Sequence, residues 1–300
     1  MNKKKKVQIN LGGLLRKLFV WGVFNRLPDK EFLELKYFSY FGKKLDLSNP
    51  NTFNEKIQWL KLNDRNPNYI KMVDKYEAKQ YVAQKIGKEY IIPTIGVWDS
   101  VEDINFDSLP NQFVLKTTHG SGGVVVCKNK QQFDFDRCKK MLNKSLHNNY
   151  YLWSREWPYK MVKPRVIAEE FMIDNALDEL RDYKILCFHG KPENIMVCTG
   201  RAQGNVQYRF FDLNWNFLPL CHGDNKLPVG FTLDKPKRLK EMIEAARLLS
   251  QGIDLIRVDF YEANGKVYFG ELTFYPDSGL DRDILPETDS EFGKKMHLTV

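Results

Sequence analysis

Residues 255–275 carry the clearest chemical signal in the chain, and their pattern predicts a β-hairpin (LIRVDFYEANGKVYFGELTFY). Both arms alternate apolar and polar residues, and the Asn264-Gly265 pair is typical of a hairpin turn. We expect a three-residue loop, residues 264–266, which pairs Asp259 with Glu271 on a polar face. A two-residue Asn-Gly turn would shift this pairing by one residue and place the two carboxylates on opposite faces.

Two carboxylates opposed across a β-ladder indicate a candidate metal site. Their repulsion costs up to about 1 kcal/mol unless a cation lies between them. Asp259 and Glu271 offer hard oxygen ligands, which suit Mg²⁺ that arrives with a nucleotide phosphate. Arg257 and Thr273 are expected to face each other on the same side of the hairpin. The alternative is that Arg257 bridges the two acids on a solvated face without a metal.

A glycine-rich segment, QFVLKTTHGSGGVVVCK, predicts a strand, a loop and a second strand over residues 112–128. The loop has little side-chain bulk, so its backbone N–H groups can lie against phosphate oxygens. Lys116 ends the first strand, where its ammonium group can reach the same phosphates. The segment is not a Walker A loop, because no Gly-Lys-Ser/Thr follows and no helix begins there. A flexible hairpin is the alternative, and His119 is expected to contact substrate or the backbone.

Residues 165–172 (RVIAEEFM) predict a buried strand that ends in two acids. Its terminal backbone and Glu169 or Glu170 can face an adenine amino group, while the next two apolar residues pack on the ring. The alternative is a strand end that has reached solvent. In the following strand, Asp182 and Lys184 share one face.

Other elements must position these groups. Residues 51–87 have the apolar spacing of helices with a break at Asn66-Pro67, and residues 237–251 predict a further helix. The irregular stretch 201–230 is typical of a region that faces substrate.

Composition bounds the class of protein. The chain of 300 residues has 43% apolar and 28% charged residues, which fits a soluble globular protein. Its net charge of +8 suits an anionic ligand such as a nucleotide or an acidic sugar. No zinc-finger spacing, aromatic RNA-binding signature or concentrated basic helix supports a nucleic-acid partner. The five cysteines lie far apart without a CxxC pair, which indicates a reducing cytosol.

The N-terminal segment combines the Lys3–Lys6 run with an apolar stretch over residues 11–24. It is too short and too charged to span a bilayer. We expect it to pack as a helix on the rest of the protein. Peripheral association with an anionic membrane surface is a minor alternative.

Taken in order, these segments resemble the ATP-grasp fold, and residues 41–279 resemble the TupA-like ATP-grasp family, which is associated with teichuronopeptide and capsular polysaccharide biosynthesis. The resembling segments are LDLSNPNTFNEKIQWLK, FVLKTTHGSGG, REWPYK, RVIAEEFM, LRDYK and VDFYEANGKVYFGELTF. The resemblance implies an α+β fold of two lobes, each with a mostly antiparallel sheet and helices, preceded by a helical N-terminal region. The implied parts are a helical extension (1–50), an N-terminal lobe (51–110), a small subdomain with the glycine-rich loop (111–165) and a large subdomain with the metal site (166–300).

The resemblance also implies ATP and Mg²⁺ as cofactors and a role for each candidate residue. Lys116 and Arg257 would be catalytic, acting on the nucleotide phosphates and the transferring phosphoryl group. The nucleotide-binding residues would be Lys116, Gly120, Ser121, Gly122, Gly123, Glu169, Glu170, Phe171, Met172, Asp182 and Lys184. The metal ligands would be Asp259, Glu271 and Thr273. Many ATP-grasp enzymes have Glu-x-Asn at this last site, and a hydroxyl is a weaker ligand than an amide, so Thr273 puts a second metal position in question.

The implied function is an ATP-dependent carboxylate–amine ligase of surface polysaccharide biosynthesis. It would join an amine or amino acid to a carboxylated sugar, such as a uronic acid, through an acylphosphate. The implied location is the cytoplasm, with the inner face of the membrane as an alternative. Two other functions stay open: a glycosyltransferase, and a non-catalytic nucleotide-binding protein.

Overall fold

The computed structural model describes residues 10–174, 180–200 and 204–299. The helices are α1 (Leu11–Val20), α2 (Asp29–Phe41), α3 (Phe53–Asn63), α4 (Asn68–Val73), α5 (Glu77–Ile86), α6 (Phe135–Leu146), α7 (Tyr150–Ser154), α8 (Leu239–Leu249) and α9 (Pro286–Lys295). The strands are β1 (Thr94–Trp98), β2 (Phe113–Thr117), β3 (Val124–Cys127), β4 (Val166–Glu170), β5 (Asp182–Phe188), β6 (Lys191–Thr199), β7 (Gln207–Phe211), β8 (Phe217–Leu218), β9 (Leu255–Ala263) and β10 (Lys266–Thr273). Short 3-10 turns are η1 (Lys88–Tyr90), η2 (Phe106–Ser108), η3 (Lys130–Gln132), η4 (Trp157–Lys160), η5 (Asp224–Lys226) and η6 (Pro276–Gly279).

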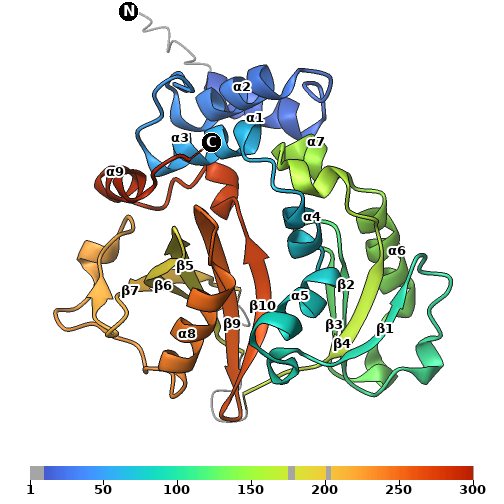
Figure 1. Ribbon diagram of the computed structural model, residues 1–300. Helices are drawn as coiled ribbons and strands as arrows, with labels where there is room; N and C mark the ends of the chain where they lie inside the picture. Colours follow the sequence, from blue (N-terminus) through green and yellow to red (C-terminus); the bar gives the residue numbers. More distant parts are fainter. Residues whose placement is uncertain (1–9, 175–179, 201–203, 300) are drawn as a thin grey trace, which may run out of the picture.

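Two antiparallel sheets form the body of the molecule, which confirms the expected α+β fold (Figure 1). The smaller sheet has the strand order β1-β4-β2-β3, and the larger has the order β10-β9-β5-β6-β7-β8. Helices α1, α2 and α3 lie over one end of both sheets, and α4 and α5 lie between them (Figure 1). The N-terminal region is therefore helical, as expected.

The larger sheet has one apolar and one polar face because residues alternate along each strand. On the apolar face, β5 and β9 contribute Ile185, Ile256 and Val258, all fully buried in the same core cluster as Met242 and Leu249 of α8. The opposite face carries Lys184 of β5 and Arg257 and Asp259 of β9. The five cysteines are all buried and free of disulfides.

The β9–β10 hairpin has a two-residue turn, so the expected three-residue loop is wrong. Ala263 pairs with Lys266. Between them Asn264 and Gly265 both adopt positive φ values, 52° and 76°, as in a type I′ turn.

A β-bulge at Gly270 nevertheless produces the expected pairing of the two acids. The bulge absorbs one residue of β10, so that Asp259 still pairs with Glu271. Without it, a two-residue turn would direct Glu271 to the apolar face. A Cβ atom at Gly270 would lie 3.0 Å from the Asp259 carbonyl oxygen, so this position favours glycine.

The helical region between residues 53 and 86 has one more break than the sequence predicts. The expected break at Asn66-Pro67 separates α3 from α4, and a second at Asp74 separates α4 from α5. The Asp74 Oδ1 atom accepts hydrogen bonds from the N–H groups of Tyr76 and Glu77, at 2.8 and 3.2 Å, and so starts α5.

The four-part division of the chain stays a prediction. Strand pairing places β1 and β4 in the smaller sheet with the glycine-rich hairpin β2–β3. The chain therefore leaves the smaller sheet after Glu170, beyond the boundary expected at residue 165.

Candidate functional site

A row of charged side chains crosses the polar face of the larger sheet on β5, β9 and β10. It brings together the residues predicted from these strands: Asp182, Lys184, Arg257, Asp259, Glu271 and Thr273. Lys184 pairs with Asp182 at 2.7 Å and also with Asp259. Arg257 donates to both oxygens of Asp259 at 2.8 Å and to Glu271 Oε1 at 3.1 Å. Arg257 also donates to Thr273 Oγ1 at 3.2 Å. It bridges the acids as the alternative interpretation expected, but not on a solvated face, because Asp259 is fully buried.

Burial distinguishes the two opposed carboxylates. Asp259 is fully buried, whereas 45% of the Glu271 side chain is exposed. Burial alone would raise the pKa of Asp259, but the charges of Arg257 and Lys184 outweigh it and lower that pKa to about 2. Asp259 is therefore ionised and holds two cations in place, while Glu271 is the carboxylate that is open to a ligand.

Lys116 of β2 is held in place by a buried acid of the neighbouring strand β4. Glu169 forms ion pairs with Lys116 and, at 2.7 Å, with Lys79 of α5. Burial alone would raise the pKa of Glu169, but the two lysine charges lower it. The Glu169 carboxylate thus orients Lys116 and is not free to face an adenine amino group.

The other predicted hinge residues follow β4. Glu170 is exposed, and its backbone N–H group donates to the Pro93 carbonyl at 3.1 Å. Phe171 and Met172 are half-buried beyond the strand end. Their roles toward adenine stay predictions.

The glycine-rich loop of residues 120–123 joins β2 to β3. Ser121 and Gly122 are exposed, and Gly122 and Gly123 have positive φ values of 80° and 62°. A Cβ atom at Gly123 would lie 2.2 Å from Ser145 Oγ, so only glycine fits there. His119 is buried, and its Nε2 atom lies 3.2 Å from the Asn148 carbonyl oxygen, which agrees with the predicted backbone contact.

A cleft of about 270 Å³ lies between α4, α5 and β10. Its lining includes Lys75, Tyr159 and Glu271. Burial lowers the pKa of Lys75, and the opposing charge of Glu271 and the like charge of Lys116 also act on it. Lys75 Nζ donates to the Gly120 carbonyl. Lys75 therefore connects the glycine-rich loop to the open carboxylate.

The sequence analysis missed Lys75 and Lys79 because both lie in a helical region whose aromatic residues indicate core. A lysine within an otherwise apolar stripe is the signal that could have found Lys79. Its ammonium group is buried and also donates to the Ile92 carbonyl at 2.7 Å and to Thr94 Oγ1 at 2.9 Å.

Helix α3 presents a second group of missed residues, a polar stripe of Asn54, Gln58 and Lys61. Gln58 Nε2 donates to the carbonyls of Ser278 and Gly279 at 2.9 and 2.7 Å. Lys61 Nζ donates to the Ser278 carbonyl and Oγ at 2.8 and 2.7 Å. All three stripe residues are buried. Their spacing of four and three residues is one helical face, a signal present in the sequence.

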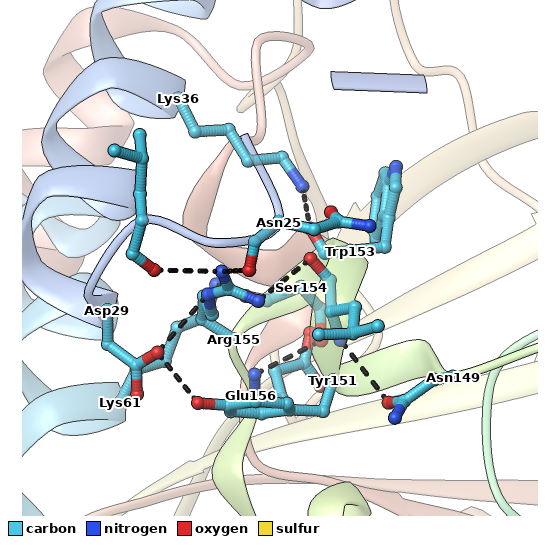
Figure 2. Close-up of polar contacts among 12 residues, drawn as sticks. Asn25, Asp29, Lys36, Lys61, Asn149, Tyr151, Trp153, Ser154, Arg155 and Glu156 are labelled. Atoms are coloured by element: carbon cyan, nitrogen blue, oxygen red, sulfur yellow. Dashed lines mark hydrogen bonds and ion pairs between the residues drawn. The ribbon is translucent and has the colours of Figure 1, made fainter. Parts of the chain in front are cut away.

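In the REWPYK segment, Arg155, Glu156 and Pro158 are buried. Figure 2 shows Arg155 reaching toward Asn25 and Asp29, with an Nη2 bond of 2.8 Å to the Asn25 carbonyl and an ion pair of 3.2 Å to Asp29. Lys61 donates to the Ser154 carbonyl at 2.9 Å. Burial raises the pKa of Glu156, and Ser278 and Lys61 stabilise its charge. This network joins the N-terminal helices to the turn that follows β10.

The donor set of the charged row fits Mg²⁺ by its chemistry. Asp259, Glu271 and Thr273 supply two carboxylates and a hydroxyl, and magnesium prefers oxygen ligands with few protein contacts. Among the described residues, no group of three or more His, Cys, Asp or Glu side chains forms a candidate metal site.

The two sheets, the glycine-rich hairpin and the charged row define an ATP-grasp protein. The chain belongs to the TupA-like ATP-grasp family, whose model matches residues 55–297.

Solved structures similar to the chain are distant. The D-alanine–D-alanine ligase of Bacillus anthracis with ATP is 17% identical, with a TM-score of 0.42 over 74% of this chain and 60% of the ligase. The Helicobacter pylori enzyme is also 17% identical, with a TM-score of 0.41 over 83% and 70% of the chains. The ligase PsnB with a precursor variant, Mg and ADP is 10% identical, with a TM-score of 0.41 over 81% and 65%. The chain thus spans less than two thirds of the first structure, and no curated protein matches it.

Within residues 10–174, 180–200 and 204–299, no helix has the length and apolar character needed to cross a membrane.

Proposed function

We propose that this protein is an ATP-dependent ligase that joins a carboxylate to an amine through an acylphosphate. The observation that carries the proposal is the charged row, in which Arg257 and Lys184 are held by Asp259 beside the open Glu271. Positioned cations are what phosphoryl transfer needs, since the transition state spreads negative charge over the phosphoryl oxygens.

The nucleotide would lie between the two sheets. Lys116 and the loop of Gly120, Ser121, Gly122 and Gly123 would contact its phosphates, and residues 169–172 would lie near adenine. Asp259, Glu271 and Thr273 would hold Mg²⁺, which would neutralise phosphate charge when bound.

The chemistry has two steps. A carboxylate oxygen of the first substrate attacks the γ-phosphorus of ATP, and the bond to the bridging oxygen breaks to release ADP. The amine nitrogen then attacks the acyl carbon, the bond to phosphate breaks, and the nitrogen loses a proton. Arg257 and Lys184 would offset charge on the transferred group, and no nucleophilic side chain is required.

The acyl substrate of the proposal is a carboxylated sugar, such as a uronic acid, of a surface polysaccharide. Two observations favour it: the net charge of +8 suits an acidic substrate, and the chain belongs to the TupA-like family.

The test is ADP release from ATP and Mg²⁺ with a panel of uronic acids, free and nucleotide-linked, with amino acids as acceptors. Hydroxylamine replaces the acceptor in a parallel series, because it traps an acylphosphate as a hydroxamate. The proposal predicts ADP and hydroxamate in equal amounts with the correct acid. Intact ATP with transfer from a sugar nucleotide would establish a glycosyltransferase, and nucleotide binding without turnover would establish a non-catalytic protein.

We also propose that the N-terminal helices lie on an anionic membrane surface. Large apolar side chains of α1 and the following turn are exposed: Leu11 by 52%, Leu14 by 47%, Val20 by 74%, Trp21 by 72% and Val23 by 58%. The Lys3–Lys6 run, which lies outside the described residues, precedes them in the sequence. Apolar side chains beside lysines suit binding at the interface of an anionic bilayer.

A further inference from the structure

Arg155 is a long charged side chain that the fold buries almost completely, with 2% of the side chain exposed. Its guanidinium group lies over the Phe32 ring of α2, 4.0 Å from the ring centroid. It also pairs with Asp29 at 3.2 Å and donates to the carbonyls of Asn25 and Leu27, at 2.8 and 3.1 Å (Figure 2). Arg155 therefore holds the segment after α7 against the connection between α1 and α2.

The backbone at Arg155 does not explain the presence of an arginine. Its φ and ψ values are 56° and 25°, a left-handed conformation that L side chains rarely adopt and that glycine usually occupies after a helix. The side chain is thus present in spite of its backbone conformation. The role of this residue therefore lies in the contacts of its guanidinium group.

The end of α7 is bound by two further buried cations. The last carbonyl groups of a helix have no partner within the helix. Lys36 of α2 donates to the Trp153 carbonyl, and Lys61 of α3 donates to the Ser154 carbonyl at 2.9 Å. The Lys61 ammonium group also donates to the carbonyl and Oγ of Ser278, in the turn after β10. The position of α7 is thus connected both to the N-terminal helices and to this turn.

The start of α7 packs against the glycine-rich loop. A Cβ atom at Gly120 would lie 3.0 Å from the Cβ atom of Tyr150, so the two residues are in direct contact. The Tyr150 ring also packs edge to face on Tyr159, at a centroid distance of 4.8 Å. Tyr159 lines the cleft that includes Glu271. A shift of α7 would therefore displace the glycine-rich loop and one wall of this cleft.

We propose that Arg155 is a positioning residue for nucleotide binding, because it holds α7 in the place from which Tyr150 supports the glycine-rich loop. The inference rests on the proposed function, in which this loop contacts the phosphates of ATP. Helices α1 and α2 precede residues 55–297, over which the family model matches. The proposal thus gives the N-terminal helices a part in nucleotide binding. Arg155 acts through α7, so its loss should weaken binding without removing a phosphate contact.

The first test measures nucleotide affinity without turnover, by calorimetry with the non-hydrolysable analogue AMP-PNP and Mg²⁺. Arg155→Gly removes the side chain and suits the backbone, so the dissociation constant should rise at least fivefold. Arg155→Lys keeps the charge beside Asp29 but lacks the planar fork that reaches both carbonyls, so the dissociation constant should rise at least threefold. If Arg155→Gly does not fold, Arg155→Lys decides the question. Unchanged affinity in folded Arg155→Lys would overturn the proposal.

The matched control is Lys56→Met, which removes another cation that binds two backbone carbonyls. Lys56 Nζ donates to the carbonyls of Gly293 and Met296, at 2.8 and 2.6 Å, and so joins α3 to the end of α9. Lys56→Met should lower the free energy of unfolding but keep the AMP-PNP dissociation constant within twofold of the wild type. The same pattern in the Arg155 variants, a loss of stability at constant affinity, would show that Arg155 is only structural.

Hydrogen exchange measured without nucleotide gives a test that does not depend on the ligase. Arg155→Lys should increase amide exchange at least threefold in residues 118–123, whereas Lys56→Met should leave the exchange of that segment unchanged. An increase confined to residues 10–41 and 150–155 would refute the support of the loop by α7.

Turnover then separates this inference from the proposed function. In the hydroxylamine series, Arg155→Lys should raise the KM for ATP at least threefold, with a smaller change in kcat. If the wild type binds AMP-PNP but forms no hydroxamate with any acid, the ligase is refuted, while the affinity and exchange comparisons still decide the role of Arg155.

Discussion

Asp259 and Glu271 face each other, yet their surroundings give them different roles. Asp259 is fully buried and both of its oxygens accept hydrogen bonds from Arg257. Removing its charge would take from Arg257 and Lys184 the buried acid that they share, and would leave Glu271 and Asp182 as their acidic partners. Glu271 is half exposed and contacts Arg257 through one oxygen. We therefore propose that Asp259 positions the two cations beside the metal site, whereas Glu271 is the carboxylate that a ligand can reach.

Glu271→Gln should abolish turnover with little effect on folding. The amide keeps an oxygen for Arg257 but loses the charge that a metal requires, so we expect ADP release to fall about 100-fold or more. The free energy of unfolding should change by only about 0.5 kcal/mol, because the side chain is partly solvated. Glu244→Gln on α8 is the matched control, since Glu244 is an exposed acid that also pairs with an arginine. If Glu271→Gln keeps the ADP release of the wild type, the proposed role of Glu271 is refuted.

Asp281 should make the stability of the protein depend on pH. Burial and the neighbouring charges of Asp277 and Asp283 raise its pKa to about 6, against the opposing effect of hydrogen bonds from the N–H groups of Asp283 and Ile284. The folded state thus favours the neutral form of the Asp281 carboxyl. The stability that this neutral carboxyl contributes is present below about pH 4 and is lost as the pH rises through 6.

The Asp281→Asn variant should therefore be more stable than the wild type at pH 7.5, by about 2 kcal/mol. The difference should shrink toward zero at pH 4.5, where the wild-type carboxyl is largely protonated. Urea unfolding at the two pH values measures it. A stability difference that is the same at both would show that Asp281 does not titrate as described.

At the scale of elements, the polar face of α3 has the function of holding the turn after β10. Its residues Asn54, Gln58 and Lys61 bind the segment 278–281, more than two hundred residues later in the chain. The resembling segment NTFNEKIQWLK therefore serves the site through this turn and does not line the cleft next to Glu271.

Gln58→Ala should destabilise the protein. It removes the side-chain donor of the buried Gly279 carbonyl and one of the two side-chain donors of the Ser278 carbonyl, which keeps Lys61, and this costs about 2 kcal/mol. Gln84→Ala, an exposed position of α5, is the control and should change stability by less than about 0.5 kcal/mol. Chemical unfolding measures the free energy of unfolding of both variants. An unchanged free energy of unfolding in Gln58→Ala would contradict the role of Gln58 in holding the turn after β10.

At the scale of the whole molecule, the candidate site needs both sheets. The smaller sheet supplies Lys116 and the glycine-rich loop, the larger sheet supplies the charged row, and α4 and α5 lie between them (Figure 1). Lys75 joins the two halves through Gly120.

The exposed apolar surface of the N-terminal helices should bind vesicles. We expect the full chain to sediment with vesicles that contain anionic phosphatidylglycerol and not with pure phosphatidylcholine. Val20→Ser/Trp21→Ser should reduce the bound fraction several-fold, and added salt should weaken binding because the lysine contribution is screened. Met161→Ser, which removes an apolar side chain that is 66% exposed elsewhere, should have no effect. Equal binding to both lipid compositions would refute the anionic surface.

The sequence by itself determined which strands carry chemistry and which of their residues share a face, because strand alternation is a local property. Alternation placed Arg257 with Asp259 and Glu271 with Thr273, and the resemblance to the ATP-grasp family implied the α+β fold. The sequence also predicted the helical N-terminal region from apolar spacing.

Only the tertiary structure decided the partners of these residues. The Glu169 pair with Lys116 and the hold of Gln58 on Ser278 join elements far apart in the chain, and the bulge at Gly270 sets the register within the hairpin. Such contacts depend on how the sheets and helices pack, and local sequence patterns carry no information about the distance between two buried side chains.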